Sequence, residues 1–83
     1  MSKEFPRVAI VTGATSGFGE ATVKKFIDEG FGVIGSGRNL SLLKTTEKQF
    51  RNHFKAVVGD ASDESVIDRL FTSAVDRFGK PAD

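Results

Sequence analysis

The chain has 83 residues, which allows one small domain and excludes a second. Its 12 basic and 11 acidic residues leave a net charge of +1, so no overall field favours nucleic acid or an anionic membrane. The chain has no cysteine, which excludes disulfides, thiolate metal ligands and thiol nucleophiles.

The amino-terminal residues lack the apolar segment of a secretory signal, and no apolar run approaches the ~18 residues of a membrane span. We therefore expect a cytoplasmic protein that binds neither membrane nor nucleic acid.

The first half of the chain predicts a strand, a helix and a second strand. The β-branched run at 8–11 is typical of a strand buried in a parallel sheet. Apolar residues then recur at helical spacing over 17–29, with Lys24 and Lys25 on the solvent face and a glycine at the end of the helix. Residues 31–34 restart a strand.

The second half continues this alternation. The second strand leads into Gly35-Ser36-Gly37-Arg38, and Asn39 can cap a helix that runs to Phe50. Residues 56–58 predict a third short strand. The last helix has the strongest pattern, with Ser62 as its predicted N-cap and Gly79 after its end. Its apolar stripe comprises Val66, Ile67, Leu70, Phe71, Ala74, Val75 and Phe78.

This β-α-β-α-β-α order predicts an α/β, Rossmann-like fold: a parallel three-stranded sheet in the order 3-2-1 with three helices, half of a doubly wound fold. The first two helices are expected on one face of the sheet and the third helix on the other. The first strand is then an open apolar edge, so we expect self-association or pairing with a further segment.

A glycine-rich turn joins the first strand to the first helix, with the spacing G-x-x-x-G-x-G. Gly13 permits a tight exit from the strand, Gly17 lets the backbone approach a phosphate, and Gly19 allows the helix to pack close to the sheet. The free amides and positive dipole end of the helix face this turn, which favours a pyrophosphate there.

The donors for a pyrophosphate would be backbone amides near Phe18, with the hydroxyls of Thr15 and Ser16 available for ribose or phosphate oxygens. The alternative is a plain strand-to-helix turn without a ligand. A P-loop is excluded, because no Gly-Lys-Ser/Thr follows, and the usual G-x-G-x-x-G dinucleotide spacing is absent.

The segment Thr12-Gly13-x-x-x-Gly17-x-Gly19 resembles the cofactor motif of the classical short-chain dehydrogenases/reductases, which are NAD(P)-dependent oxidoreductases. Gly37-Arg38-Asn39 and Gly59-Asp60-Ala61 stand where that family contacts the adenosine end of the cofactor, and the matches cover the whole chain in register. A narrower likeness points to members that oxidise 3-hydroxy acids, including serine-type substrates, with NADP.

The resemblance implies roles for particular residues. Asp60 would hydrogen-bond the adenine amino group, and Ala61 would lie beside the ring. The residues implied around the ribose and pyrophosphate are Gly13, Thr15, Ser16, Gly17, Phe18 and Gly19.

The end of the second strand favours NADP(H) over NAD(H). NAD sites of this kind place a carboxylate there, which would repel a 2′-phosphate. Here the sequence reads Ser36-Gly37-Arg38, and the Arg38 guanidinium can pair with the phosphate dianion instead. The alternative is that Arg38 is only a solvated surface charge.

The resembled family transfers protons with a tyrosine, a lysine four residues later, a serine and an asparagine. The chain contains no tyrosine. We therefore expect residues 1–83 to be a partial, NADP-binding Rossmann domain without the catalytic half that would bind an alcohol or carbonyl substrate. The alternatives are a non-catalytic dinucleotide-binding module, a truncated fragment, or a fragment that binds no ligand.

Other polar and aromatic residues predict no further site. His53, the single histidine, is expected at the surface near a helix end. The spacing of Asp60, Asp63 and Glu64 matches no metal-binding loop, and a helix start explains the last two. Most of the eight phenylalanines are expected in the core, with Phe18 and Phe5 undecided.

Overall fold

A computed structural model describes residues 7–15 and 17–82 of the chain. Three parallel strands form one sheet in the order β1-β2-β3, which confirms the predicted fold. The elements, in chain order, are β1 (Val8–Val11), α1 (Gly17–Asp28), β2 (Gly32–Gly37), α2 (Leu40–Phe50), a short 3₁₀ helix (Arg51–His53), β3 (Phe54–Val58) and α3 (Glu64–Phe78).

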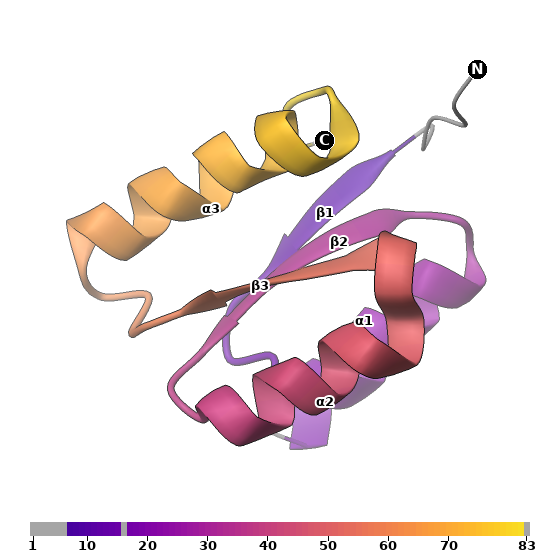
Figure 1. Cartoon of the computed structure of the whole chain (residues 1–83), viewed down its shortest axis with the longest axis horizontal. Coiled ribbons are helices and arrows are strands. Elements are labelled where there is room, and N and C mark those ends of the chain that lie inside the picture. Colours follow the sequence, from indigo (N-terminus) through magenta and orange to yellow (C-terminus); the bar gives the residue numbers. More distant parts are fainter. Residues whose placement is uncertain (1–6, 16, 83) are drawn as a thin grey trace.

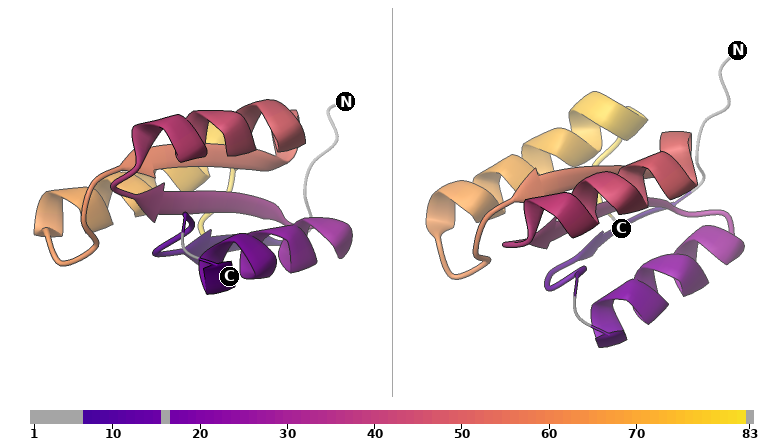
Figure 2. Two further views of the ribbon diagram at one scale, coloured as in Figure 1. Left: turned by 90° about the horizontal axis from the view of Figure 1, so that it is seen from below. Right: turned by 60° about the horizontal axis from the view of Figure 1, so that its bottom comes forward.

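Helices cover both faces of the sheet. α1 and α2 lie on one face and α3 lies on the other (Figure 1), as the right-handed crossovers require. Figure 2 shows α1 and α2 alongside each other across the strands. The core under α3 contains Val8, Ile34, Val57, Val66, Leu70, Ala74 and Phe78. The core under α1 and α2 contains Val11, Ala14, Val23, Val33, Leu43 and Phe54.

The boundaries of two strands differ from the prediction. β2 begins at Gly32, one residue after the predicted start. β2 continues through Gly37, and all six of its residues are buried. β3 begins at Phe54, two residues before the predicted start, with Phe54 buried beneath α2 and Lys55 exposed. The lysine interrupts the apolar run in the sequence, but it occupies an outward position on an edge strand, where a charge is tolerated.

The predicted N-cap of the last helix is wrong by one residue. Asp63 caps α3, because its Oδ1 accepts the Ser65 N–H at 2.9 Å. Ser62 instead donates its own N–H to Asp60 Oδ1 at 2.9 Å, in a local turn before the helix. The other predicted caps are confirmed: Asn39 Oδ1 accepts the Leu42 N–H at 3.1 Å, and Gly79 ends α3 in the left-handed conformation.

The apolar stripe of α3 is wider than the surface that it covers. Its buried residues follow one line along the helix, whereas Phe71 and Val75, which belong to the predicted stripe, are 55% and 49% exposed. Phe18 is 92% exposed. Within the described residues, no helix combines the length and apolar character needed to cross a membrane.

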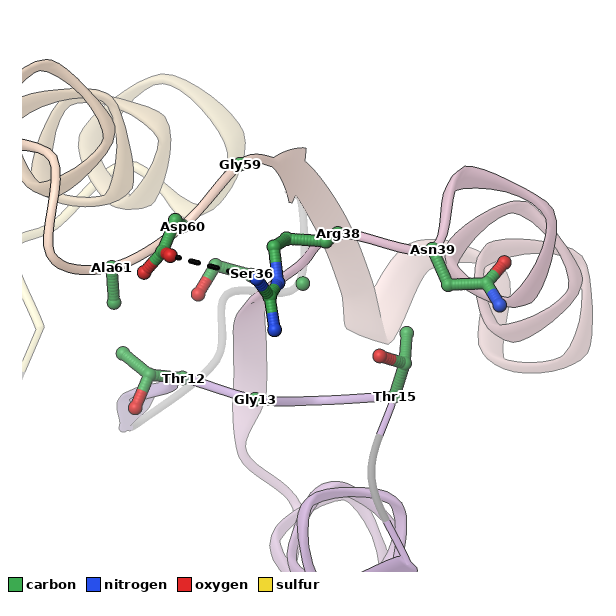
Figure 3. A pocket seen from close by; sticks show the side chains of 10 residues that line it. Thr12, Gly13, Thr15, Ser36, Arg38, Asn39, Gly59, Asp60 and Ala61 are labelled. Carbon is green, nitrogen blue, oxygen red and sulfur yellow. Dashed lines mark ion pairs between the residues drawn. The ribbon is translucent and has the colours of Figure 1, made fainter.

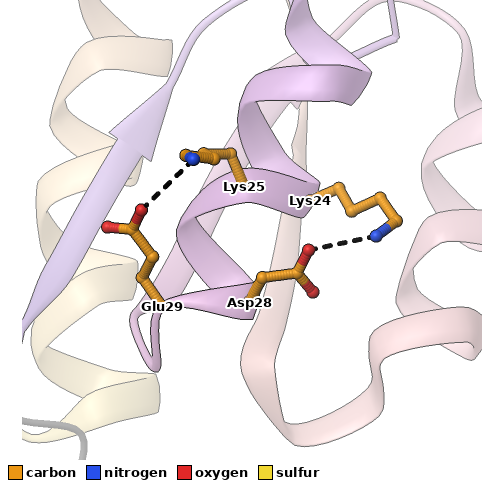
Figure 4. Close-up of polar contacts among 4 residues, drawn as sticks. All are labelled: Lys24, Lys25, Asp28 and Glu29. Atoms are coloured by element: carbon orange, nitrogen blue, oxygen red, sulfur yellow. Dashed lines mark hydrogen bonds and ion pairs between the residues drawn. The ribbon is translucent and has the colours of Figure 1, made fainter.

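Lys24 and Lys25 lie on the solvent face of α1, as predicted. Lys24 pairs with Asp28 at 3.0 Å and Lys25 with Glu29 at 3.5 Å (Figure 4). All four side chains are more than half exposed, so these pairs add little stability and serve mainly to keep the helix surface solvated.

The first turn of α1 packs directly against the exit of β1. A Cβ on Gly19 would overlap the carbonyl group of Gly13 and the Cα of Ala14, which are backbone atoms. Gly13 has a φ of 66°, a left-handed conformation that favours glycine. The predicted roles of Gly13 in the tight exit and of Gly19 in close packing are therefore confirmed.

Gly19→Ala is expected to lower the free energy of unfolding by about 1–3 kcal/mol, because no rotamer change relieves a clash with backbone. Gly17→Ala is the matched control, since a Cβ there meets nothing within 4 Å and alanine favours a helix. Urea denaturation measures both variants. Equal stability of the two would contradict the close contact at Gly19.

Asp63→Ala is expected to cost about 0.5–2 kcal/mol of stability through loss of the α3 N-cap. Ser62→Ala should cost clearly less, because Ser62 lies outside the helix. Thermal unfolding of both variants tests this order. A larger loss for Ser62→Ala would restore the prediction made from the sequence.

Candidate functional site

A pocket of about 500 Å³ opens at the carboxyl ends of all three strands. This volume lies within the range of small-molecule sites, and in parallel sheets this edge is where ligands bind. The lining residues come from the β1–α1 turn, the end of β2 with the start of α2, and the loop after β3: Thr12, Gly13, Thr15, Ser36, Gly37, Arg38, Asn39, Gly59, Asp60 and Ala61.

Two backbone hydrogen bonds hold these three segments together. The Ala14 N–H donates to the Ser36 carbonyl at 2.7 Å, which ties the glycine-rich turn to β2. The Gly59 N–H donates to the Gly37 carbonyl at 2.8 Å, which ties the exit of β3 to the same strand. The walls of the pocket are therefore fixed by main chain and do not depend on long side chains.

Gly37 lets the turn approach β2 closely. A Cβ on Gly37 would lie 3.0 Å from Thr15 Oγ1, a distance tighter than ordinary van der Waals contact. The absence of a side chain at Gly37 thus leaves room for Thr15 at the rim of the pocket.

Arg38 and Asp60 face each other across the pocket (Figure 3). Arg38 Nη1 lies 3.9 Å from Asp60 Oδ2, with the two side chains 81% and 53% exposed. Such an exposed, long pair is weak and can be exchanged for a ligand. The Arg38 guanidinium can therefore leave Asp60 and pair with a ligand anion that carries more negative charge.

The Asp60 carboxylate is held in its charged form. Hydrogen bonds from the Ser62 backbone N–H and, second, the Ser62 side chain lower the pKa of Asp60; desolvation opposes them, and the Arg38 charge makes the smallest contribution, which also lowers the pKa. An ionised Asp60 can only accept hydrogen bonds, so it suits a donor group on a ligand.

The structure brings most of the predicted site residues together. Those that line the pocket are Gly13, Thr15, Gly37, Arg38, Asn39, Asp60 and Ala61. Three predicted residues do not line the pocket: Gly17, Phe18 and Gly19, which form the first turn of α1. Gly19 packs against the backbone of Gly13 and Ala14. Ser16 lies outside the described residues.

Sequence reasoning assigned no contact to Thr12 or Ser36 and named Gly59 only as part of the Gly59-Asp60-Ala61 segment, whereas the structure places all three on the pocket wall. Each stands at or next to the carboxyl end of a strand, which is the edge where parallel sheets bind ligands. That rule could have found them once the strands were placed.

One buried polar atom indicates that the pocket is shaped for a polar ligand. Ser36 is 1% exposed, and its Oγ has no hydrogen-bond partner among the described residues. Together with the glycine-lined wall and the Arg38 guanidinium, this hydroxyl fits a nucleotide with phosphate and base groups. The fold and the place of this pocket define a Rossmann-like protein of the kind that binds nucleotides at this edge.

The chain belongs to the short-chain dehydrogenase family, whose model matches residues 7–81. It is 36% identical over 69 residues to a serine 3-dehydrogenase of Agrobacterium fabrum, covering 83% of this chain and 28% of that protein. It is 46% identical over 56 residues to a probable NADP-dependent dehydrogenase of Haemophilus influenzae, covering 68% of this chain and 22% of that protein.

A solved relative has the same fold. The crystal structure of the 3-ketoacyl-(acyl-carrier-protein) reductase from Brucella melitensis complexed with NADH matches with a TM-score of 0.82 and 33% identity, covering 92% of this chain and 31% of that one. The chain spans about a third of the length of the curated relatives that it matches. The family resemblance read from the glycine motif is therefore confirmed.

The lowered pKa of Asp60 predicts a pH effect on stability. Asp60 has a lower pKa in the folded chain than in the unfolded chain, so its ionised form stabilises the fold. This contribution to the free energy of unfolding is full at pH values above the ordinary aspartate range. It is lost as the pH falls through the pKa of Asp60 in the folded chain. We expect Asp60→Asn to flatten the acid decline in stability. Urea denaturation from neutral to acid pH measures it, and an unchanged decline would contradict the assignment.

Proposed function

We propose that this chain is the NADP(H)-binding part of an oxidoreductase that transfers hydride between NADP and an alcohol or carbonyl substrate. The observation that carries the proposal is Arg38, placed at the end of β2 and lining a pocket whose β2 wall, Ser36 and Gly37, carries no carboxylate. A guanidinium there favours a 2′-phosphate, whereas a carboxylate would favour the ribose hydroxyls of NAD.

The pyrophosphate is assigned to the glycine-rich turn and the amino terminus of α1. The first turn of an α-helix presents backbone amides that helical bonding does not use, and Gly17 and Phe18 stand in the first turn of α1. Gly17 leaves open space beside them, because a Cβ added at Gly17 would meet no atom within 4 Å. Thr15 on the pocket wall and Ser16 supply hydroxyls for ribose or phosphate oxygens.

The adenosine is assigned to the space between the ends of β2 and β3. Asp60 would accept a hydrogen bond from the adenine amino group, and Ala61 and Asn39 would border the base and its ribose. Binding of NADPH would move Arg38 from its 3.9 Å contact with Asp60 toward the 2′-phosphate, which carries the greater negative charge.

The names of the relatives mention both NADP and NADH, so they do not distinguish the two cofactors for this chain. The charge at the pocket is the evidence that does. One relative is named a probable NADP-dependent dehydrogenase, and one solved neighbour was crystallised with NADH. The Arg38 guanidinium supports NADP(H) for this chain.

Nicotinamide supplies the hydride chemistry, and the residues of this chain bind and orient the dinucleotide. The sequence contains no tyrosine, and the chain spans about a third of its relatives. We therefore place the proton-transfer residues and the substrate pocket of the oxidoreductase outside these 83 residues.

Arg38→Ala is expected to weaken NADPH binding roughly 10-fold or more, because a charge-assisted contact to the 2′-phosphate is lost, and to leave NADH binding nearly unchanged. Isothermal titration of the protein with each dinucleotide measures both affinities. Lys48→Ala, which removes one positive charge in the last turn of α2 away from the pocket, is the control.

Two results would overturn the proposal. The first is an unchanged NADPH affinity in Arg38→Ala, which would leave Arg38 as a surface charge. The second is failure of the wild-type protein to bind either dinucleotide, which favours the ligand-free alternative. A non-catalytic dinucleotide-binding module predicts the same binding but no hydride transfer by the longest natural form of the protein.

We also propose that the exposed apolar surface of this chain is covered by a second copy or by a further segment of a longer protein. β1 has a neighbouring strand on one side only within the described sheet, and Phe71 and Val75 are about half exposed on α3. Sedimentation of the 83-residue chain should show self-association that weakens in Phe71→Ser. A monomer that unfolds cooperatively would contradict this.

A further inference from the structure

Ser36 occupies a position that its strand pattern reserves for an apolar residue. On β2, alternate side chains point to opposite faces, so Ser36 shares the α3 face with Ile34, which is fully buried in the core beneath α3. Ser36 is equally enclosed, at 1% exposure, and pairs in register with Val57 of β3. An alanine would fit here without leaving a polar atom behind.

The hydroxyl of Ser36 is unsatisfied in the protein itself. It is the single buried side-chain oxygen or nitrogen without a hydrogen-bond partner among residues 7–15 and 17–82. Buried polar groups are nearly always paired, and one left unpaired lowers stability. Packing and folding therefore give no reason for a hydroxyl at this position.

The hydroxyl lies at the wall of the ligand pocket. Figure 3 shows the Ser36 side chain between Thr12 on one side and Asp60 and Ala61 on the other. The backbone of Ser36 is itself fixed, because its carbonyl accepts the Ala14 N–H at 2.7 Å. The Ser36 backbone is thus held in place beside this part of the pocket, with its buried Oγ directly beneath the wall.

We propose that the Ser36 hydroxyl hydrogen-bonds the adenine ring of the bound dinucleotide, and this inference rests on the proposed function. The position favours adenine because Figure 3 shows the Ser36 side chain beside Asp60 and Ala61, the two residues assigned to the base, while its carbonyl and not its hydroxyl is bonded to the glycine-rich turn. The adenine edge carries an amino donor next to ring nitrogens that only accept. Asp60 can take the donor, and the neutral Ser36 O–H can supply the hydrogen bond that a ring nitrogen needs.

Ser36 thereby differs from Arg38 in what it recognises. Arg38 binds the 2′-phosphate, which only NADPH carries, so it discriminates between NADPH and NADH. Ser36 contacts the adenine base, which both dinucleotides share. Its loss should reduce both affinities by one common factor. The ratio of the two affinities should stay the same.

The test is titration of Ser36→Ala with NADPH, NADH and adenosine 2′,5′-bisphosphate. We expect all three affinities to fall by about 2- to 12-fold, the range for one neutral hydrogen bond, while nicotinamide mononucleotide shows no change relative to wild type. The thermal midpoint of the free variant should stay equal or rise, because the unpaired hydroxyl is gone. Ser36→Cys, which keeps the size but donates weakly, should lose affinity similarly.

Ser41→Ala, on the exposed side of α2, is the matched control and should leave the affinities unchanged. Unchanged dinucleotide affinity in Ser36→Ala would overturn the inference. So would a lower thermal midpoint with no loss of affinity, because the hydroxyl would then serve the fold alone. If wild type binds no dinucleotide, the proposed function itself fails; if wild type and Arg38→Ala behave as expected and Ser36→Ala does not, only this inference fails.

Discussion

The site depends on the close approach of the glycine-rich turn to its neighbours. In the first turn of α1, Gly19 packs against the Gly13 carbonyl, and the Ala14 N–H donates to the Ser36 carbonyl at 2.7 Å. Backbone therefore meets backbone at both contacts, and side chains larger than hydrogen would separate the elements. Because these contacts fix the start of α1 relative to the end of β2, they also fix the distance between the first turn of α1 and Arg38.

The same arrangement explains why the pocket is polar although the sheet is almost wholly apolar. Both faces of β2 are covered by helices along most of its length, and its apolar residues fill the two cores. After Ile34 the strand continues with glycine and serine, which are still buried, and the exposed Arg38 follows directly after the strand end at the pocket. Binding groups thus gather where burial ends and free main chain begins.

Charge at the pocket is balanced between two exposed groups. Arg38 and Asp60 are 3.9 Å apart, and hydrogen bonds from Ser62 keep the carboxylate ionised by lowering its pKa. The positive Arg38 and the negative Asp60 make the net charge of the pocket close to zero in the free protein. The whole chain is also close to neutral, with a net charge of +1. An anion at this pocket would therefore be selected by local geometry and not by an overall field.

The sequence alone determined the element order, the parallel sheet, the glycine turn and the family, because periodicity and glycine spacing are local properties of the chain. It also indicated Arg38 and Asp60. It misplaced the α3 N-cap and did not separate the covered from the exposed residues of the α3 stripe, since competition between adjacent capping residues and the width of the covered surface are settled only by packing. Tertiary structure alone decided that Ser36 is buried without a partner on the pocket wall, because that depends on strands and loops distant in sequence.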